Sequence, residues 1–439
     1  MKKNAIFSSL FAGLIVCNAY AADVIGVRAG GLADAVGADT TVQVLKVTGI
    51  LDASDFAFIA DKMPNIRQLD ISGCSIVAYS GKALPFSGLR NSAQAQLPPY
   101  SFIGMTNLES VILPQTLTSI GTGAFAGAGI RSIMIPDGVV SIADYVFMRC
   151  EALESVVFPA SLEQLGLRTF ANCTSLHSVL FDSGNSLARL PDGTFEGCTS
   201  LKELNLDVLA QCSEIGPWSL AHCYSLTEVA VPPAVRTLGR GAMLDDNAVR
   251  NLILSHGIET FEEYSLAGLK RVSTLSLPAS VTFFATGAMA DWMSLSNFNV
   301  SALTDIPELG DAVWQGIDPS AVTLVVADDI ADCFSETSQW QDFKIVKHSD
   351  YIASTTDMES KLADAPYITV KVDGDVLFIQ SEGTGLGTVS IFNTSGLRVA
   401  LTEAGAEKSA EIDISSMPGG GAYLIVTSAS GVAKIVLFK

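Results

Sequence analysis

A phenylalanine-led phrase returns every 22 to 25 residues along much of this chain. A large apolar residue fills the repeating position, here called the landmark position, at Phe102, Phe125, Phe147, Phe170, Phe195, Leu220, Met243, Leu266, Met289 and Val313. Such a period is typical of stacked coils, each too small to bury its own apolar face and stabilised by its neighbours. The sequence therefore predicts a solenoid, which offers a long regular surface and favours binding over catalysis.

A second phrase, which alternates apolar and polar residues and ends at proline, precedes the landmark positions. It reads LESVILP over residues 108–114 and LESVVFP over residues 153–159. This pattern predicts one short strand per coil. Together the phrases resemble the BspA-like class of leucine-rich repeats, whose unit reads roughly LxxIxLPxxLxxIGxxAFxxCxx, over about residues 97 to 327. The resemblance implies a β-rich solenoid and a role in adhesion or recognition. From Gly216 onward the AF phrase is replaced, which leaves the turn geometry of those coils open.

The segments on either side of the repeats have the character of terminal structures. A strand pattern is followed by a helix pattern that is capped near Ser54 and stopped by Pro64. Residues 22–96 are therefore expected to form an α/β N-terminal cap with the first repeat, since an end coil would otherwise expose its core. Residues 97–346 are expected to form the leucine-rich repeat solenoid, and Trp340 and Phe343 belong to its closing coil.

The C-terminal part loses the period. Residues 347–366 are polar and predict a linker, whereas residues 367–439 contain short alternating runs separated by Gly, Asn and Ser. These runs predict a small C-terminal β-sandwich. Phrases such as residues 389–396 and the final run 434–439 resemble the C-terminal sorting domains of Bacteroidetes secreted proteins. The resemblance implies an export and anchoring signal where the type IX system is present, and otherwise a structural module.

The N-terminus has the pattern of a secretory signal peptide over residues 1–21. Lys2 and Lys3 precede an apolar run, and Ala19-Tyr20-Ala21 offers a small-x-small cleavage site. Lipoprotein processing at Cys17 is the alternative. No later run reaches the roughly 18 apolar residues of a membrane helix. The sequence thus predicts a secreted or cell-surface protein whose mature chain does not insert into a membrane.

The charge balance narrows the class of partner. The chain carries 26 basic and 46 acidic residues, a net charge of −20. Such a field repels nucleic acid and anionic lipid. We therefore expect an extracellular protein or glycan ligand, and no nucleic acid.

Four of the cysteines, Cys150, Cys173, Cys198 and Cys223, each follow a landmark position by three residues. A disulfide or metal ladder is one interpretation, and buried free thiols that fill an inward position are the other. A metal site would call for CxxC pairs or nearby histidines, and the four histidines of the chain do not cluster with these cysteines. Buried thiols are therefore the preferred interpretation.

Signatures of catalysis and cofactor binding are sparse. Gly121–Gly127 fits a dinucleotide-binding fingerprint but is one copy of the repeat's turn. The pairs Asp245-Asp246 and Asp328-Asp329 could contact calcium, but they fit solvated turn acids better. No HExxH, GxSxG, Walker or EF-hand pattern occurs. The sequence predicts no catalytic residue, cofactor or metal site, and thus no enzyme.

The outward residues of the strands supply the candidate binding site. Alternate residues of a strand face outward, so the serines and the apolar residues two positions later are expected to form stacked columns. The serine column is Ser110, Ser132, Ser155 and Ser178, and the apolar stripe is Ile112, Met134, Val157 and Leu180. Four coils make a stripe roughly 14 Å long, and exposed apolar stripes mark contact surfaces. Alternatively, residues 77–100 fold back and cover the stripe.

The predicted function is adhesion to, or recognition of, host or neighbouring-cell proteins or glycans through the solenoid face. A structural spacer in an envelope complex is the first alternative, and an undetected hydrolase the second. A uniformly polar strand face would favour the spacer. A pocket that gathers His, Asp and Ser from several coils would favour the hydrolase.

Mass spectrometry of the exported protein tests the predicted signal peptide. Cleavage after Ala21 should leave Ala22 as the first residue. A mature chain that begins with a lipid-modified Cys17 would instead establish the lipoprotein alternative.

Overall fold

The computed structural model describes residues 21–38, 40–84, 88–182 and 184–352, together with seven strands and residues 407 and 408 between positions 368 and 437. They fall into two compact units. The first contains the residues up to Leu226 with Gly239–Asp246, and the second contains Thr227–Leu238 and the residues from Asn247 on. Residues 1–20 of the predicted signal peptide, Cys17 included, lie outside the described residues.

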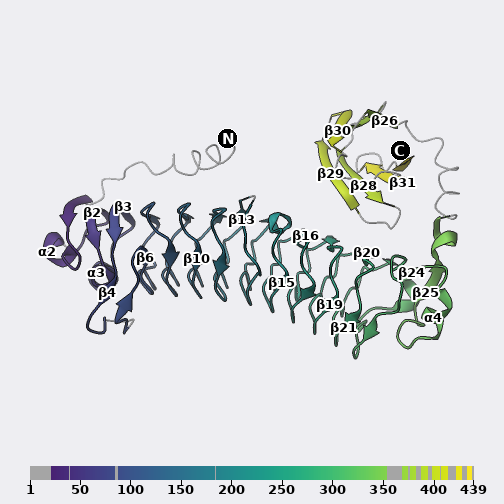
Figure 1. Ribbon diagram of the computed structural model, residues 1–439, viewed down its shortest axis with the longest axis horizontal. Coiled ribbons are helices and arrows are strands. Elements are labelled where there is room, and N and C mark those ends of the chain that lie inside the picture. The colour runs from purple at the N-terminus through teal and green to yellow at the C-terminus, as the bar shows by residue number, and fades with distance from the viewer. Residues whose placement is uncertain are drawn as a thin grey trace. The chain divides into compact units, whose positions relative to one another are not determined.

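A parallel sheet runs through the cap and the coils of the first unit (Figure 1). Its order is β1-β2-β3-β7-β9-β11-β13-β14, so each coil adds one strand beside the last. Its strands are β1 Ala21–Val27, β2 Val44–Leu51, β3 Gln68–Ile76, β7 Ser110–Ile112, β9 Ser132–Met134, β11 Ser155–Phe158, β13 Ser178–Phe181 and β14 Glu203–Leu204.

The other elements of the first unit complete the coils. A second parallel sheet has the order β12-β10-β8-β6, and β4 and β5 form a small antiparallel pair. The bounds are β4 Tyr79–Ser80, β5 Asn91–Ser92, β6 Gln96–Leu97, β8 Ser119–Ile120, β10 Ser141–Ile142, β12 Gln164–Leu165 and β15 Glu214–Ile215, with helices α2 Leu32–Val36 and α3 Ala53–Lys62 and the 3₁₀ turn η1 Leu206–Val208.

The second unit continues the same pattern. Its parallel pairings follow β16-β18, β17-β19-β21-β23 and β20-β22-β24-β25. The bounds are β16 Glu228–Ala230, β17 Thr237–Leu238, β18 Asn251–Ile253, β19 Thr260–Phe261, β20 Thr274–Ser276, β21 Phe283–Phe284, β22 Asn297–Asn299, β23 Glu308–Leu309, β24 Thr323–Val326 and β25 Lys344–Lys347, with η2 Pro319–Ala321 and α4 Ala331–Glu336. The predicted β-rich solenoid is confirmed in both units.

The tail contains seven strands, of which β26, β27, β28, β31 and β32 lie at the predicted alternating runs, whereas β29 and β30 were not predicted. They form two antiparallel sheets, β26-β27-β30 and β29-β28-β31-β32. The bounds are β26 Ile368–Asp373, β27 Val376–Ser381, β28 Gly387–Asn393, β29 Arg398–Gly405, β30 Ser409–Asp413, β31 Ala422–Thr427 and β32 Ala433–Leu437. Residues 348–352 of the predicted linker are helical, and its residues 353–366 lie outside the described residues. The β-sandwich and sorting-domain assignments stay predictions.

Each turn is built around its landmark residue by two residues with left-handed backbone. Tyr145 and Arg149, with φ of 59° each, bracket Phe147. The Phe147 N–H donates to the Thr169 carbonyl of the next coil at 2.8 Å. After Gly216 the geometry is unchanged, because Trp218 and His222 bracket Leu220 in the same way. The turn therefore depends on the backbone pattern and on apolar burial, and phenylalanine is not required.

The structure corrects the last landmark position. Met289 N–H donates to the Val313 carbonyl, just as Phe147 donates to the residue before Phe170. Ala312 and Gly316 have positive φ and bracket Trp314. Trp314 is therefore the landmark residue, and Val313 precedes it. This coil has 25 residues, against 23 in each of the three coils directly before it, so the expected position fell one residue short.

The core of the first unit is a column of buried aromatic rings. Phe102, Phe125, Phe147, Phe170 and Phe195 are fully buried. Successive ring centroids lie 5.1, 5.3, 5.1 and 5.5 Å apart. Ring pairs at such distances stabilise by more than their buried area alone. The coils of Phe125, Phe147 and Phe170 thus each complete their core with a ring from either neighbour.

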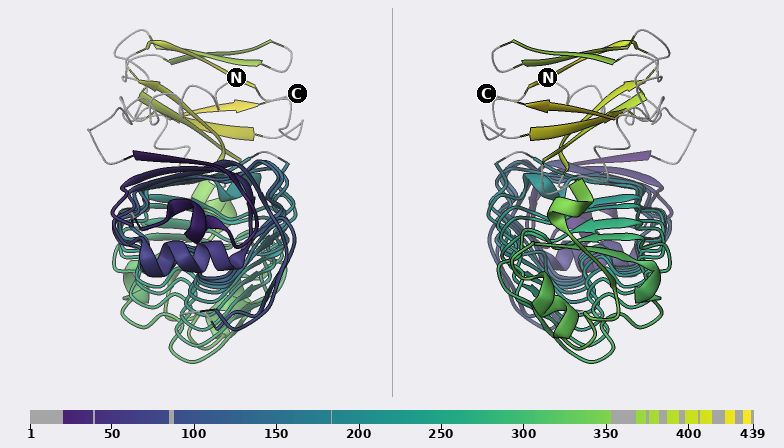
Figure 2. Two further views of the ribbon diagram at one scale, coloured as in Figure 1. Left: turned by 90° about the vertical axis from the view of Figure 1, so that its left-hand side faces the viewer. Right: turned by 90° about the vertical axis from the view of Figure 1, so that its right-hand side faces the viewer.

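The N-terminal cap closes one end of this column. Helix α3 lies across the end coil (Figure 2, left), and its Phe56 packs edge-on against Phe102 with centroids 5.7 Å apart. The N-cap residue is Asp52, not Ser54, and it forms a capping box with Asp55. The Asp55 carboxylate also accepts hydrogen bonds from the Gly30 and Leu32 N–H groups at 2.9 Å each. One buried acid therefore ties the loop before α2 to the start of α3.

The closing coil of the second unit also buries aromatic residues. Trp340, which is fully buried, packs on Trp314 at 5.0 Å and edge-on to Phe334 of α4 at 5.2 Å. Helix α4 lies at the end of these coils (Figure 2, right). The ring of Phe343, the other residue assigned to the closing coil, lies 6.1 Å from that of Trp340.

The cysteines that follow the landmark positions are buried free thiols. Each donates to the carbonyl of the landmark residue one coil earlier, as Cys150 Sγ does to Phe125 at 3.0 Å and Cys173 Sγ to Phe147 at 3.0 Å. Burial raises the pKa of the Cys150 thiol to about 12. The thiols act as small fillers that also satisfy a buried carbonyl, as preferred from the sequence.

Asp246 occupies the same position after Met243 and corrects a prediction. It is fully buried and is not a solvated turn acid. Its Oδ1 accepts the Cys223 N–H at 2.7 Å, and its Oδ2 is buried without a hydrogen-bond partner. Burial raises the pKa of Asp246 well above the ordinary aspartate value. Burial therefore disfavours the ionised form of this side chain, which takes the position that cysteines fill in four other coils.

Phe147→Ala tests the aromatic column. Loss of a fully buried phenylalanine should lower the free energy of unfolding by about 3–5 kcal/mol, measured by urea denaturation. Because coupling is nearest-neighbour, hydrogen exchange should quicken mainly near residues 125 to 170. Unchanged protection there would contradict the packing described.

Asp246→Asn tests the raised pKa of this buried acid. Because the folded pKa is raised, the stabilising contribution of Asp246 is complete below about pH 4, the unfolded value, and is lost as pH rises through the folded pKa. Asparagine cannot ionise, so its advantage over aspartate should grow with pH by at most about 1.4 kcal/mol per unit. Urea midpoints at pH 4, 6 and 8 measure this, with Asp245→Asn as control. A difference independent of pH would show that Asp246 does not bind an extra proton on folding.

Candidate binding surface

The strands of the first unit stack the predicted site residues in register. Ser110 pairs with Ser132, Ser132 with Ser155, and Ser155 with Ser178. Met134 likewise pairs with Val157, and Val157 with Leu180. The intervening residues Val111 and Val156 are buried. The structure therefore brings the serine column and the apolar stripe together on the outer face of one sheet.

The apolar stripe is open to solvent at its N-terminal end. Ile112 and Met134 are each 43% exposed, and Val157 and Leu180 are half-buried. The described part of residues 77–100 forms the β4–β5 pair and β6, and it leaves Ile112 and Met134 uncovered. The alternative that this segment hides the stripe is thus wrong for these two residues.

Polar groups bound the stripe at both ends. Beside Ile112 lies Asp70, whose carboxylate is 3.6 Å from Lys46 Nζ. Burial opposes ionisation of Asp70, but hydrogen bonds from Ser72 and the charge of Lys46 outweigh it, so the pKa of Asp70 lies below the ordinary value. At the other end, the Asn205 amide donates to the Phe181 carbonyl and accepts the Phe181 N–H. An apolar centre with a polar rim is the usual anatomy of a protein–protein contact.

The serine column adds hydrogen-bonding capacity. Ser178 Oγ donates to Glu203 at 2.8 Å. The hydroxyls of Ser110, Ser132 and Ser155 have no hydrogen-bond partner among the residues that the structure describes. They are half-buried and can donate to or accept from a ligand.

A column of charged residues lies beside the serines. Arg67 pairs with Glu109, and Arg131 lies 3.6 Å from Glu154. Pairs this exposed contribute little to stability. They keep this flank of the sheet polar, which confines the apolar surface to the stripe.

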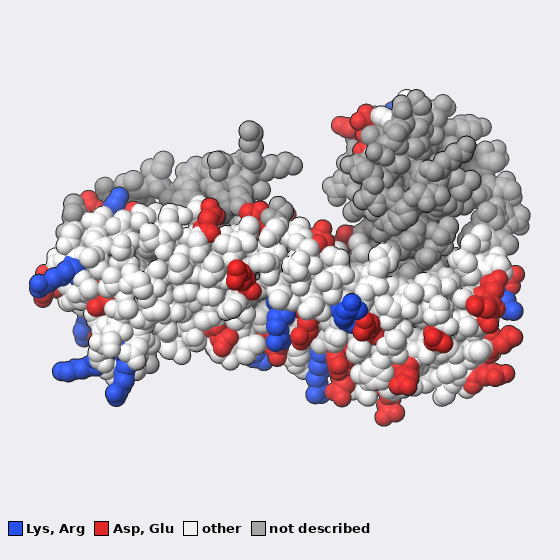
Figure 3. Space-filling view, in the orientation of Figure 1, with Lys and Arg blue, Asp and Glu red and all other residues white. Residues whose placement is uncertain are grey.

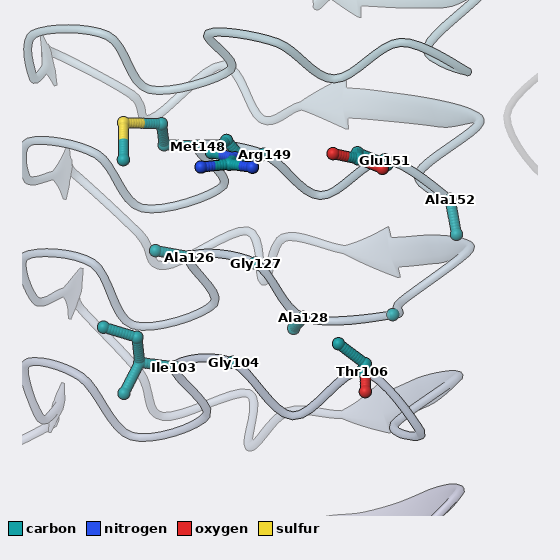
Figure 4. Close-up of a pocket in the computed structure, with 11 residues that line it drawn as sticks. Ile103, Gly104, Thr106, Ala126, Gly127, Ala128, Met148, Arg149, Glu151 and Ala152 are labelled. Atoms are coloured by element: carbon teal, nitrogen blue, oxygen red, sulfur yellow. The ribbon is translucent and has the colours of Figure 1, made fainter.

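The turn edge of the first coils carries a groove that sequence reasoning missed (Figure 4). Its volume is about 530 Å³, and three consecutive coils line it. The floor is the run Ala126–Gly129, whereas the neighbouring coils contribute Ile103, Met148, Arg149 and Glu151. A side chain at Gly129 is excluded, because a Cβ there would lie 2.0 Å from the Thr106 carbonyl oxygen. The sequence signal for this groove is a run of four small residues, Ala126–Gly129, where the adjacent repeats carry larger side chains.

Acidic residues gather over β24, β25 and α4 of the second unit (Figure 3). Asp328 accepts the Ser349 N–H at 3.0 Å, which holds the pKa of Asp328 below its usual range. No group of three His, Cys, Asp or Glu side chains within the described part of the chain could hold a metal ion. The hypothesis that Asp328-Asp329 contacts calcium gains no support.

Comparison with protein families matches the BspA type leucine rich repeat region in six copies, over residues 95–208 and 188–313. The chain belongs to this class of leucine-rich repeat proteins, as its repeat phrases and coil geometry indicated. None of the curated protein sequences compared with the chain matches it.

Several solved structures are similar in fold. A leucine-rich repeat protein from Bacteroides ovatus is 18% identical, with 69% of this chain and 88% of that chain covered and a TM-score of 0.39. A leucine rich cell surface protein from Faecalibacterium prausnitzii is 18% identical, with 65% and 79% covered and a TM-score of 0.31. The pneumococcal vaccine antigen PcpA is 15% identical, with 69% and 78% covered and a TM-score of 0.35.

Among the described residues, none of the helices has the length and apolar character needed to cross a membrane.

Proposed function

We propose that this protein is a secreted or surface-displayed, non-catalytic recognition protein that binds an extracellular protein through the sheet face of its first unit. The observation that carries the proposal is the open apolar stripe at Ile112 and Met134, in register with the serine column. A stripe roughly 14 Å long with a polar rim fits the apolar centre of a modest protein contact. Export through the predicted signal peptide is part of the proposal.

The structural-spacer alternative predicts a uniformly polar strand face. The exposure of Ile112 and Met134 counts against it, because an apolar stripe on a spacer would be an aggregation hazard without a use. The hydrolase alternative calls for a pocket that gathers His, Asp and Ser. The groove is lined by none of these residue types.

Charge reversal of the stripe tests the proposal. Met134→Glu combined with Val157→Glu places two charges at outward positions, so the fold should persist while capture of an extracellular matrix protein panel falls at least about tenfold, a loss of about 1.4 kcal/mol. Surface plasmon resonance measures capture, and circular dichroism checks the fold.

The matched control is Val156→Glu, one residue away but buried. A charge there should unfold the flanking coils, because a buried unpaired carboxylate is costly. If wild type captures a panel member and the outward double variant captures it equally well, the stripe is not the binding site.

A further inference from the structure

The position two residues before each landmark residue has a left-handed backbone in all ten coils. Four coils place glycine there, the residue that adopts this conformation without strain. Four others place a bulky aromatic residue there despite the backbone penalty. The glycines are Gly123, Gly193, Gly241 and Gly287, and the aromatic residues are Tyr100, Tyr145, Trp218 and Tyr264. Since the fold accepts glycine at this position, the aromatic rings are not needed to form the turn.

The neighbouring glycines give three of the four rings a flat support. A Cβ added to Gly123 would lie 2.9 Å from Tyr100 Cδ1, and one added to Gly241 would lie 3.0 Å from Trp218 Cε3. The ring of one coil therefore lies over the glycine backbone of the next. In the second unit, Tyr264 lies over Gly287 in the same manner.

The polar ends of these side chains are available for a ligand. The hydroxyls of Tyr100 and Tyr145 and the indole N–H of Trp218 have no hydrogen-bond partner among the described residues. Tyr145 is 37% exposed, and the Trp218 nitrogen is not among the buried polar atoms that lack a partner. A rigid ring with an apolar face and a solvated polar end suits a binding surface.

Between Tyr145 and Trp218 the same column carries a charged planar group. Arg168 occupies the position in its coil, with its guanidinium 3.3 Å from Glu196. In the first unit, this position therefore provides three aromatic rings and one guanidinium that can form hydrogen bonds. Each of these side chains lies on the turn edge, three residues after the end of a short strand, namely β6, β10, β12 or β15. The strands that carry the apolar stripe are different ones.

We propose that Tyr100, Tyr145, Arg168 and Trp218 form a strip that binds a neutral polysaccharide chain. The C–H faces of pyranose rings can pack on aromatic faces, whose electron density is negative, while sugar hydroxyls bond to Arg168, the phenols and the indole. Stacked coils rise by about 4.8 Å each, so Tyr100 and Tyr145, two coils apart, are separated by about one disaccharide of an extended β-linked chain. Trp218, three coils beyond Tyr145, extends the strip.

Two features favour a neutral glycan over other partners. The chain carries a net charge of −20, and Asp144 and Asp192 directly precede Tyr145 and Gly193 in the column, which disfavours anionic polymers. The rings are also spread in a line across several coils. The hot spots of protein interfaces instead cluster at the centre of a patch.

Affinity gel electrophoresis tests the strip with soluble hydroxyethylcellulose, xyloglucan, galactomannan and laminarin, and with the anionic polymers alginate and polygalacturonate. The full-length protein should be retarded by at least one neutral polymer and by neither anionic one. Tyr145→Gly combined with Trp218→Gly should weaken that retardation at least about tenfold. The substitution introduces the residue that four coils already carry, and thermal unfolding checks that the fold persists.

Two controls separate the strip from the sheet face. Tyr224→Ala removes an exposed aromatic residue outside the column, and Met134→Glu with Val157→Glu alters the apolar stripe. Both should leave retardation unchanged. The proposal is overturned if no neutral polymer retards the wild type, if only the anionic polymers do, or if the folded glycine variant binds normally. Loss of retardation in the stripe variant would place glycan binding on the sheet face instead.

Discussion

The backbone hydrogen bonds that join one turn to the next are the constraint on which the coils depend. From Phe102 to Leu220, and again at Leu266 and Met289, the landmark N–H donates to the carbonyl of the residue before the next landmark, as Phe125 does to Val146 at 2.9 Å. This bond fixes the coil-to-coil distance, which in turn lets the buried rings pack at about 5 Å. No coil has a core of its own, so register, packing and surface columns all follow from the same contact.

The stack converts single residues into columns, and the columns explain the candidate surfaces. An outward residue that recurs in register becomes a stripe, as Met134 and Val157 do. A left-handed position that recurs becomes a line of rings and glycines on the turn edge. The sheet face and the turn edge therefore present different chemistry from one repeat unit: an apolar band with serines on one, separated aromatic rings on the other.

Much of the fold and of the sheet-face site could be predicted from the sequence, because the repeat is short and recurs in every coil. Inward residues such as Val156 and the stacked serines follow from strand alternation once the repeat is recognised. Trp314 could not be placed by counting, because the coils vary from 22 to 25 residues and the register shows only in the backbone hydrogen bond and the positive-φ residues. The burial of Asp246 could not be foreseen either, since four other coils place a thiol at this position, and burying a carboxyl there raises its pKa. The groove arises from a contrast in side-chain size between three neighbouring coils, which a pattern of apolar and polar residues does not register.

Native-state hydrogen exchange of the wild-type protein tests the central claim most directly. If the turn-to-turn bonds hold the coils together, the landmark amides of Phe125, Phe147 and Phe170 should be among the slowest to exchange in the first unit, with similar protection in each. Amides of exposed turn residues without such a bond should exchange much faster. Landmark amides that exchange as fast as those exposed amides in the folded protein would contradict the account.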